Sequence, residues 1–155
     1  MNSYDFKNQV AVVTGGANGI GYSVAERLSK SGAIVKIWDF DIEVARKAAE
    51  TINAEAIECN ITDWISVKSA TETSINSNER IDILVNSAGI AGPNETVVNY
   101  DNEAWDQIIS VNLTGTYYVN KAVVPYMKTN GYGRIVNIAS VAGKDGKTDK
   151  SLTCA

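Results

Sequence analysis

Short apolar runs alternate with segments of helical periodicity along this chain. The apolar runs predict five strands, over residues 10–13, 33–38, 54–59, 81–85 and 134–139. Between them, apolar residues recur three and four positions apart, which predicts helices over 20–28, 42–52, 62–75 and 101–126. Strands that alternate with helices form a parallel sheet covered on both faces. The pattern therefore predicts an α/β protein with a doubly wound parallel sheet, whose ligands bind at the carboxyl ends of the strands.

The first predicted strand runs into the first predicted helix through a glycine-rich turn. Residues 14–21 read T-G-G-A-N-G-I-G. Such a turn points backbone N–H groups and the positive end of a helix dipole at one spot, with no side chains in the way. This arrangement favours a phosphate-binding turn of a dinucleotide site, and a loop with ordinary glycines is the alternative.

The second predicted strand ends at Asp39, where a dinucleotide-binding fold places the carboxylate that accepts hydrogen bonds from the adenosine ribose. A carboxylate there repels a 2′-phosphate, and the turn residues Ala17 and Asn18 offer no positive charge to neutralise one. Both features favour NAD(H) over NADP(H). Asp39 could instead cap the helix that begins near Ile42, although Asp41 is also placed to do so.

Composition excludes several other functions. A chain of 155 residues with 45% hydrophobic residues predicts one domain, and a net charge of −4 gives no footprint for nucleic acid or an anionic membrane. The chain has no histidine, which excludes a Ser-His-Asp triad and the usual zinc-hydrolase sites, and its two cysteines do not suggest a metal site. No segment resembles a signal peptide or a membrane span, so we expect a cytoplasmic protein.

Several motifs occur together in one order. They are the glycine turn at 14–21, the acidic Asp39, N-S-A-G at 86–89, Asn112 in V-N-L-T-G, and Ser140 in N-I-A-S-V-A-G. In this combination the chain resembles the short-chain dehydrogenase/reductase family from about Phe6 to Gly146. The resemblance implies a Rossmann-like sheet over residues 1–146. The polar residues 147–155 have no strand or helix period and are expected to form a disordered tail.

The resemblance also implies which residues bind the cofactor. Two departures stand out: Asn60-Ile61 replaces the usual Asp-Val pair beside the adenine, and Ser87 replaces a second asparagine. The cofactor-binding residues implied are Gly15, Asn18, Gly19, Ile20, Gly21, Asp39, Asn60, Ile61, Asn86, Ala88 and Gly89.

For catalysis the family uses asparagine, serine, tyrosine and lysine side chains. Asn112 matches the asparagine that holds a proton-relay water, and Ser140 matches the serine that orients the substrate oxygen. Thr153 stands where the tyrosine is expected, and the lysine would fall beyond Ala155. A threonine hydroxyl cannot replace the tyrosine, so we expect hydride transfer to be weak or absent. Ser140 could instead be a turn residue, and Asn112 could satisfy a buried carbonyl.

Two hypotheses about function follow. The first is an NAD(H)-dependent oxidoreductase acting on a secondary alcohol or ketone, of sugar-derived or 3-oxoacyl type, of which this chain is a shortened or altered version. The second is a dinucleotide-binding remnant or association subunit without turnover. The doubly wound order has six strands, so the fifth strand should lie at an exposed edge, with aggregation, partner dependence or low stability as the consequence. In the family, the long helix from Val111 forms part of a homo-oligomer interface, so a homo-oligomer is also expected.

Overall fold

A five-stranded sheet forms the centre of the computed structural model, which describes residues 4–141. All neighbouring strands are parallel, as the alternating pattern predicts, and their order across the sheet is β3-β2-β1-β4-β5. The chain thus builds a doubly wound sheet of Rossmann type. The strands are β1 (Val10–Thr14), β2 (Ile34–Asp39), β3 (Glu55–Glu58), β4 (Ile83–Asn86) and β5 (Arg134–Asn137).

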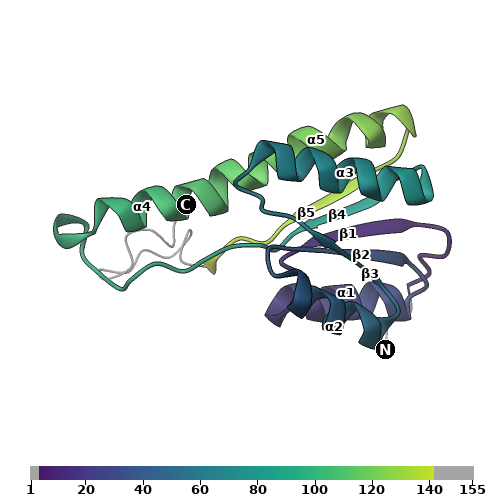
Figure 1. The fold of residues 1–155 in the computed structure, drawn as a ribbon, viewed down its shortest axis with the longest axis horizontal. Helices are drawn as coiled ribbons and strands as arrows, with labels where there is room; N and C mark the ends of the chain where they lie inside the picture. The colour runs from purple at the N-terminus through teal and green to yellow at the C-terminus, as the bar shows by residue number, and fades with distance from the viewer. Residues whose placement is uncertain (1–3, 142–155) are drawn as a thin grey trace.

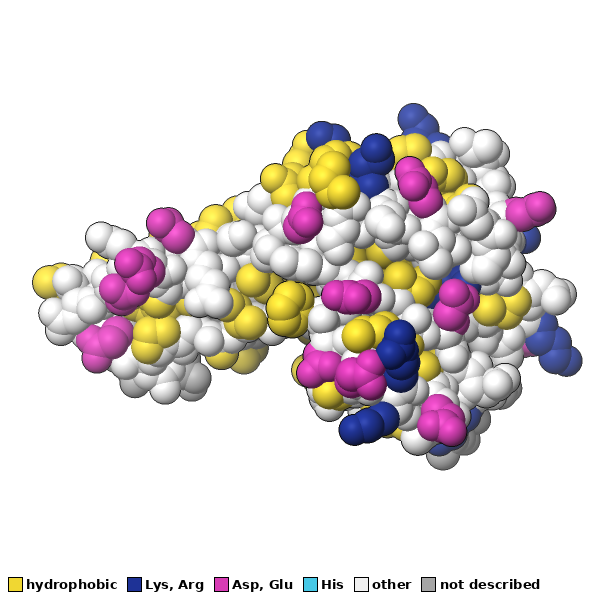
Figure 2. All heavy atoms as spheres, in the orientation of Figure 1, with side chains coloured by type: hydrophobic (Ala, Val, Ile, Leu, Met, Phe, Trp, Pro, Cys, Tyr) yellow, Lys and Arg dark blue, Asp and Glu magenta, His cyan; other side chains and the backbone are white. Residues whose placement is uncertain are grey.

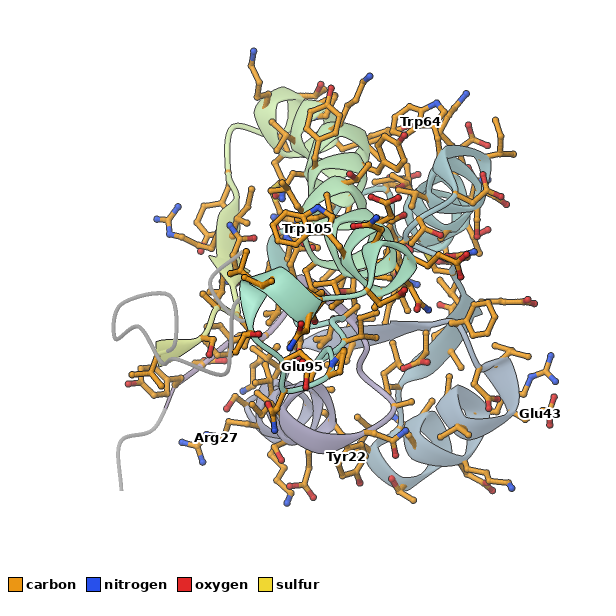
Figure 3. All side chains as sticks on the ribbon, turned by 90° about the vertical axis from the view of Figure 1, so that its left-hand side faces the viewer. Tyr22, Arg27, Glu43, Trp64, Glu95 and Trp105 are labelled. Carbon is orange, nitrogen blue, oxygen red and sulfur yellow. The ribbon has the colours of Figure 1, made fainter. Side chains whose placement is uncertain are left out.

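Helices cover both faces of this sheet (Figure 1). On one face lie α1 (Gly19–Lys30) and α2 (Ile42–Ile52), and on the other lie α3 (Trp64–Asn78) and α5 (Thr116–Thr129). Figure 3 shows the two layers from the side, with Glu43 of α2 and Trp64 of α3 far apart. Each layer buries its own apolar cluster because successive side chains of a strand point to opposite faces. In β1, Ala11 and Val13 face α1 and α2, whereas Val12 belongs to the cluster under α3 and α5.

Aspartates begin three of the helices, as the sequence predicts. Asp41 accepts hydrogen bonds from the N–H groups of Glu43 and Val44, both at 3.1 Å. Asp63 caps α3, which resolves the choice between Thr62 and Asp63, and Asp101 caps α4 (Asn102–Ile108). Each cap satisfies N–H groups that have no partner within the helix.

The long helix predicted over 101–126 is not a continuous α-helix. Between α4 and α5 lies a π-helix, η2 (Ile109–Gly115), and a short 3₁₀ helix, η1 (Val97–Asn99), precedes α4. The segment from α4 to η2 extends beyond the sheet as an arm (Figure 1). Gly115 lies where the arm meets the body, and a Cβ there would be 2.8 Å from Cδ1 of Ile61. The absence of a side chain at Gly115 thus allows the helix to lie close to the loop after β3.

Strand β5 lies at the edge of the sheet, which confirms the expectation from the sequence. Among the described residues it pairs with β4 alone, and all four of its residues are exposed. The apolar side chains of Ile135 and Val136 are 40% and 48% exposed. The predicted domain boundary after Gly146 and the predicted tail lie outside the described residues.

Asp82, predicted within the fourth strand, lies just before β4 and is completely buried. Its Oδ2 accepts hydrogen bonds from the Val10 N–H at 2.8 Å and from Arg80 Nε at 2.8 Å. Its backbone pairs with Val10 and accepts the N–H of Arg134, so this residue connects β1, β4 and β5. A buried carboxylate is tolerated only with such partners, and the guanidinium of Arg80 supplies the opposite charge.

Lysine and arginine side chains are scattered over the body on the face shown in Figure 2, where acidic side chains lie among them. No basic patch of the kind that binds nucleic acid stands out on this face. Within residues 4–141, no helix is both long enough and apolar enough to span a bilayer.

Candidate functional site

The glycine turn fits closely against the segment that follows β4. Gly15 has φ +61°, and a Cβ on it would lie 2.8 Å from Cα of Ala88. A Cβ on Gly21 would lie 2.2 Å from the carbonyl oxygen of Gly15. Both contacts involve backbone that cannot move aside, so glycine is required at these two positions. Gly19 has φ +55° but faces open space.

The first turn of α1 is open to an anion. Asn18 is the N-cap residue, yet its side chain makes no capping hydrogen bond, and no acidic residue lies in the first turn. The first N–H groups of a helix have no partner within it and carry the positive end of the helix dipole. This end of α1 can therefore hold a phosphate group, as the sequence predicts.

Asp39 lies beside the glycine turn at the end of β2. One carboxylate oxygen accepts the N–H of Ala17 at 3.1 Å, and the other accepts the N–H of Asp41 at 3.2 Å. Helix α2 is capped by Asp41, so the alternative role of Asp39 as the cap is wrong. Each oxygen of Asp39 has a further lone pair, which leaves the carboxylate able to accept hydroxyl groups of a ligand.

A cavity of about 550 Å³ opens next to Asp39. We call it the Asp39 pocket. It brings together six of the residues predicted to bind a cofactor, which are Gly15, Asp39, Asn60, Ile61, Ala88 and Gly89. No lysine or arginine is among the described residues that line it, which are Gly15, Trp38, Asp39, Phe40, Cys59, Asn60, Ile61, Thr62, Ala88, Gly89, Ile90, Gln107, Ser110 and Val111.

Cys59 is buried in the wall of this pocket, one residue beyond the end of β3. Burial raises the pKa of its thiol to about 12, and the negative charges of Asp39 and Asp63 act in the same direction, against a hydrogen bond with Ser66. The thiol is therefore protonated at neutral pH and serves as a small apolar side chain.

Thr14 holds the segment after β4 in place. Its hydroxyl oxygen accepts the N–H groups of Ser87 and Ala88, at 3.1 and 3.2 Å. Asn86 Nδ2 donates to Asn137 Oδ1 at 2.8 Å, which links the ends of β4 and β5. The Oδ1 of Asn86 is buried without a hydrogen-bond partner among the described residues. The side chain of Asn86 thus joins two strand ends, while Ala88 lies against the glycine turn.

A second cavity, of about 360 Å³, lies beyond this segment. We call it the Ser140 pocket. It contains both predicted catalytic residues, Asn112 and Ser140, together with Asn86. The Asp39 and Ser140 pockets share the lining residues Ala88, Gly89 and Ile90. The two cavities are therefore adjacent parts of one cleft at the carboxyl ends of the strands.

Asn112 belongs to the π-helix, and both polar atoms of its side chain bind the backbone of Ile90. Its Oδ1 accepts the Ile90 N–H at 2.9 Å, and its Nδ2 donates to the Ile90 carbonyl at 3.0 Å. A Cβ on Gly89 would lie 3.3 Å from the same Oδ1. Asn112 therefore positions the segment shared by the two pockets. The carbonyl that it satisfies belongs to Ile90, which is exposed rather than buried.

Four predicted cofactor residues, Asn18, Gly19, Ile20 and Gly21, lie outside the two pockets. The side chain of Ile20 is 63% exposed and lines a separate groove with Phe6 and Arg27. Arg27 of the same helix projects away from the sheet in Figure 3, which looks along the arm past Trp105. At Ile20, therefore, only the backbone can contribute to the glycine turn.

Several lining residues were not predicted from the sequence. Gln107, Ser110 and Val111 reach the Asp39 pocket from the arm. Thr14 lines neither pocket, but its hydroxyl accepts the N–H of Ser87 and so holds the segment after β4. The helical spacing of Gln107, Ser110 and Val111 indicates that they share one face of a helix. Nothing in the sequence indicates that this face lies over the ends of β2 and β3. Among residues 4–141, no group of three or more His, Cys, Asp or Glu side chains could hold a metal ion.

Comparison with known proteins agrees with this geometry. The model of the family described as short chain dehydrogenase matches residues 9–154, so the chain belongs to the short-chain dehydrogenase family, whose members are oxidoreductases. It is 39% identical to the 2-dehydro-3-deoxy-L-rhamnonate dehydrogenase (NAD(+)) of Sphingomonas sp. (strain SKA58), over 97% of this chain and 61% of that protein.

Two further proteins show the same relationship. The chain is 36% identical to the 3-oxoacyl-[acyl-carrier-protein] reductase FabG of Haemophilus influenzae, over 96% of this chain and 62% of that protein. A crystal structure of NAD+-bound xylitol dehydrogenase superimposes with a TM-score of 0.91 and 32% identity, covering 96% of this chain and 59% of the other. The chain thus spans about 60% of the length of the relatives it matches.

Proposed function

We propose that this chain binds NAD(H) across the cleft, as the dinucleotide-binding part of an oxidoreductase acting on a secondary alcohol or ketone of sugar-derived or 3-oxoacyl type. One observation carries the proposal: the Asp39 and Ser140 pockets are adjacent and share the lining residues Ala88, Gly89 and Ile90. A dinucleotide is an elongated ligand with a nucleoside at each end. The glycine turn lies beside the first pocket, where the pyrophosphate between those ends would approach it.

The residues at the turn fit this ligand. Gly15 and Gly21 allow the backbone to come close where any Cβ would collide, and the first turn of α1 offers open N–H groups. Asp39 is the carboxylate for the adenosine ribose, and the lack of lysine or arginine in the described lining disfavours a 2′-phosphate. NAD(H) is therefore the preferred cofactor.

In the Ser140 pocket, Ser140 would orient the substrate oxygen and Asn112 would hold the segment beside the nicotinamide. The bound nicotinamide supplies the hydride donor or acceptor. Proton exchange with the substrate oxygen needs a further group, and no tyrosine follows Tyr132 in these 155 residues. General acid–base catalysis typically contributes about 10²- to 10⁴-fold, so turnover by this chain is expected to be weak or absent.

Calorimetric titration of the purified chain with NADH and NADPH tests the proposal. NADH should bind at least about tenfold more tightly, because the Asp39 carboxylate repels the extra phosphate. In Asp39→Ser this preference should shrink to within about threefold, with most of the change in the affinity for NADPH.

Asp41→Ser is the matched control. It removes a carboxylate two residues away, and serine retains the helix cap, so the NADH preference should remain. Equal affinity of the unaltered chain for both dinucleotides would reject Asp39 as the discriminating residue. A folded sample that binds neither of them would reject the cofactor proposal altogether.

A further inference from the structure

The side-chain amide of Asn60 is held in one orientation at the base end of the Asp39 pocket. Its Oδ1 accepts the backbone N–H of Thr62 at 3.0 Å and the Thr62 hydroxyl at 2.8 Å. A backbone N–H can only donate, so the atom that faces it must be the oxygen rather than the nitrogen. A carbonyl oxygen has two lone pairs, and both are used here.

The loop around Asn60 supports this orientation. The Asn60 N–H donates to Ser66 Oγ at 3.0 Å, and the Asn60 carbonyl accepts the N–H of Asp63 at 3.1 Å. These bonds connect the loop to the first residues of α3. Asn60 lines the pocket, and its Nδ2 has no hydrogen-bond partner among residues 4–141. The group that Asn60 can offer a ligand is therefore a donor.

Apart from Asp39, the polar side chains among the described lining residues are uncharged, so none of them offers the strong acceptor that a carboxylate at position 60 would. Gln107 carries both a donor and an acceptor, and the Ser110 hydroxyl can do either, whereas the Thr62 hydroxyl gives its proton to Asn60 and has only a lone pair left for a ligand. Asp39 is the only carboxylate among the described lining residues, and its oxygens are held at the glycine turn and at the start of α2.

Adenine presents an amino group, a donor, at C6. With the base lying beside Asn60, as the proposed binding mode has it, an aspartate at position 60 would accept from that group with its second oxygen, whereas Asn60 would meet it with another donor. We propose that the base end of this pocket does not select for the adenine amino group and accepts a purine with a carbonyl oxygen at C6. The ligand class is then nicotinamide purine dinucleotides, with the hypoxanthine form bound as readily as NAD(H). This inference rests on the proposed function.

The test compares NADH with reduced nicotinamide hypoxanthine dinucleotide, which differs from it only in the base. Calorimetry on the unaltered chain should give dissociation constants within about threefold of each other. In Asn60→Asp the oxygen bound to Thr62 is preserved and the second oxygen becomes an acceptor. That variant should prefer NADH by at least about tenfold, because the new oxygen repels the carbonyl of hypoxanthine.

Asn60→Ala is the control, since it can neither donate nor accept. It should bind both dinucleotides more weakly while keeping their ratio near that of the unaltered chain. A preference of the unaltered chain for NADH above about tenfold would overturn the inference and leave the cofactor proposal intact. An unchanged ratio in a folded Asn60→Asp variant would also overturn it. Binding of neither dinucleotide by the folded, unaltered chain would reject the proposed function and this inference with it.

Discussion

The Asp39 pocket and the Ser140 pocket differ in the strands that support them. The Asp39 pocket lies at the ends of β1, β2 and β3, and β1 is buried at all five positions. The Ser140 pocket lies at the ends of β4 and β5, and β5 is exposed at all four of its positions. In the proposed function, binding of the adenosine part of a ligand therefore depends mainly on the inner strands β1 and β2, with the edge strand β3 beside them, whereas positioning of Ser140 depends on the exposed edge strand β5.

This difference separates two requirements of the proposed function, cofactor binding and the positioning of Ser140. A cofactor site on buried strands keeps its geometry as long as the core is folded. The position of a side chain that follows an edge strand depends on the pairing of that strand with its single neighbour. Edge strands open locally more easily than strands inside the sheet. The Asp39 pocket can thus keep its shape even where the Ser140 pocket is poorly fixed.

The largest expected effect compares two residues that are partners in neighbouring strands. Leu84 of β4 is completely buried, and its partner Ile135 of β5 is 40% exposed. Leu84→Ala should lower the free energy of unfolding by about 2–5 kcal/mol, because it leaves a cavity in the core. Ile135→Ala should cost less than about 1 kcal/mol, because its side chain is already partly in water. Urea unfolding of both variants measures the difference, and equal losses would show that β5 is not a weaker edge.

A second prediction concerns two glycines in the same backbone conformation. Gly15 and Gly131 have φ of +61° and +66°, but a Cβ on Gly15 meets Ala88 whereas one on Gly131 meets nothing within 4 Å. Gly15→Ala should weaken NADH binding by about 100-fold, since the collision displaces the segment shared by the two pockets. Gly131→Ala adds the same backbone strain before β5 and should leave the dissociation constant unchanged. Similar losses in both variants would mean that backbone strain alone, rather than the contact with Ala88, controls binding.

The smallest effect concerns Cys59 in the wall of the Asp39 pocket. Burial raises the pKa of this thiol to about 12, whereas a thiol in an unfolded chain titrates near about 8.5. Above that pH the unfolded state loses its proton while the folded state keeps it. The contribution of the Cys59 thiol to the free energy of unfolding is therefore fully present below about pH 8.5, and it is lost as the pH rises towards 12.

At pH 9.5 the expected loss is about 1 kcal/mol relative to pH 7. Cys59→Ser removes this titration, so the difference in stability between the two proteins should narrow by that amount between the two pH values. Urea unfolding in a Cys154→Ser background measures it. Parallel pH profiles for the two proteins would show that the pocket wall is open to water in solution.

Much of the fold followed from short-range features of the sequence. Strand runs and helix caps such as Asp41 and Asp101 are local signals, and the structure contains the elements that they predict. The π-helix at Ile109–Gly115 was missed, because the apolar spacing of the segment is also compatible with an uninterrupted α-helix. The burial of Asp82 was missed as well, since the partner that requires it, the Val10 N–H, lies 72 residues away.

The candidate site was predictable in type and less so in detail. Gly15 and Asp39 lie where the glycine motif and the strand end place them. Ile20 does not reach either pocket, because its place within the motif gives its sequence neighbours but not the direction of its side chain. The bonds that orient Asn60 and Asn112 also depend on three-dimensional packing, which has no periodic signal in the sequence.

The junction at Asp82 also has a consequence for how the chain is made. Residue 82 is synthesised 72 positions after Val10, which at about 5–20 residues per second corresponds to roughly 4–14 s. During that interval β1 can pair with β2, but its other edge has no partner. Strand β1, at the centre of the sheet, thus gains its second neighbour, β4, only after β2 and β3 have been made. Any event during these seconds of synthesis therefore meets an open β1 edge, before the exposed β5 edge has been made.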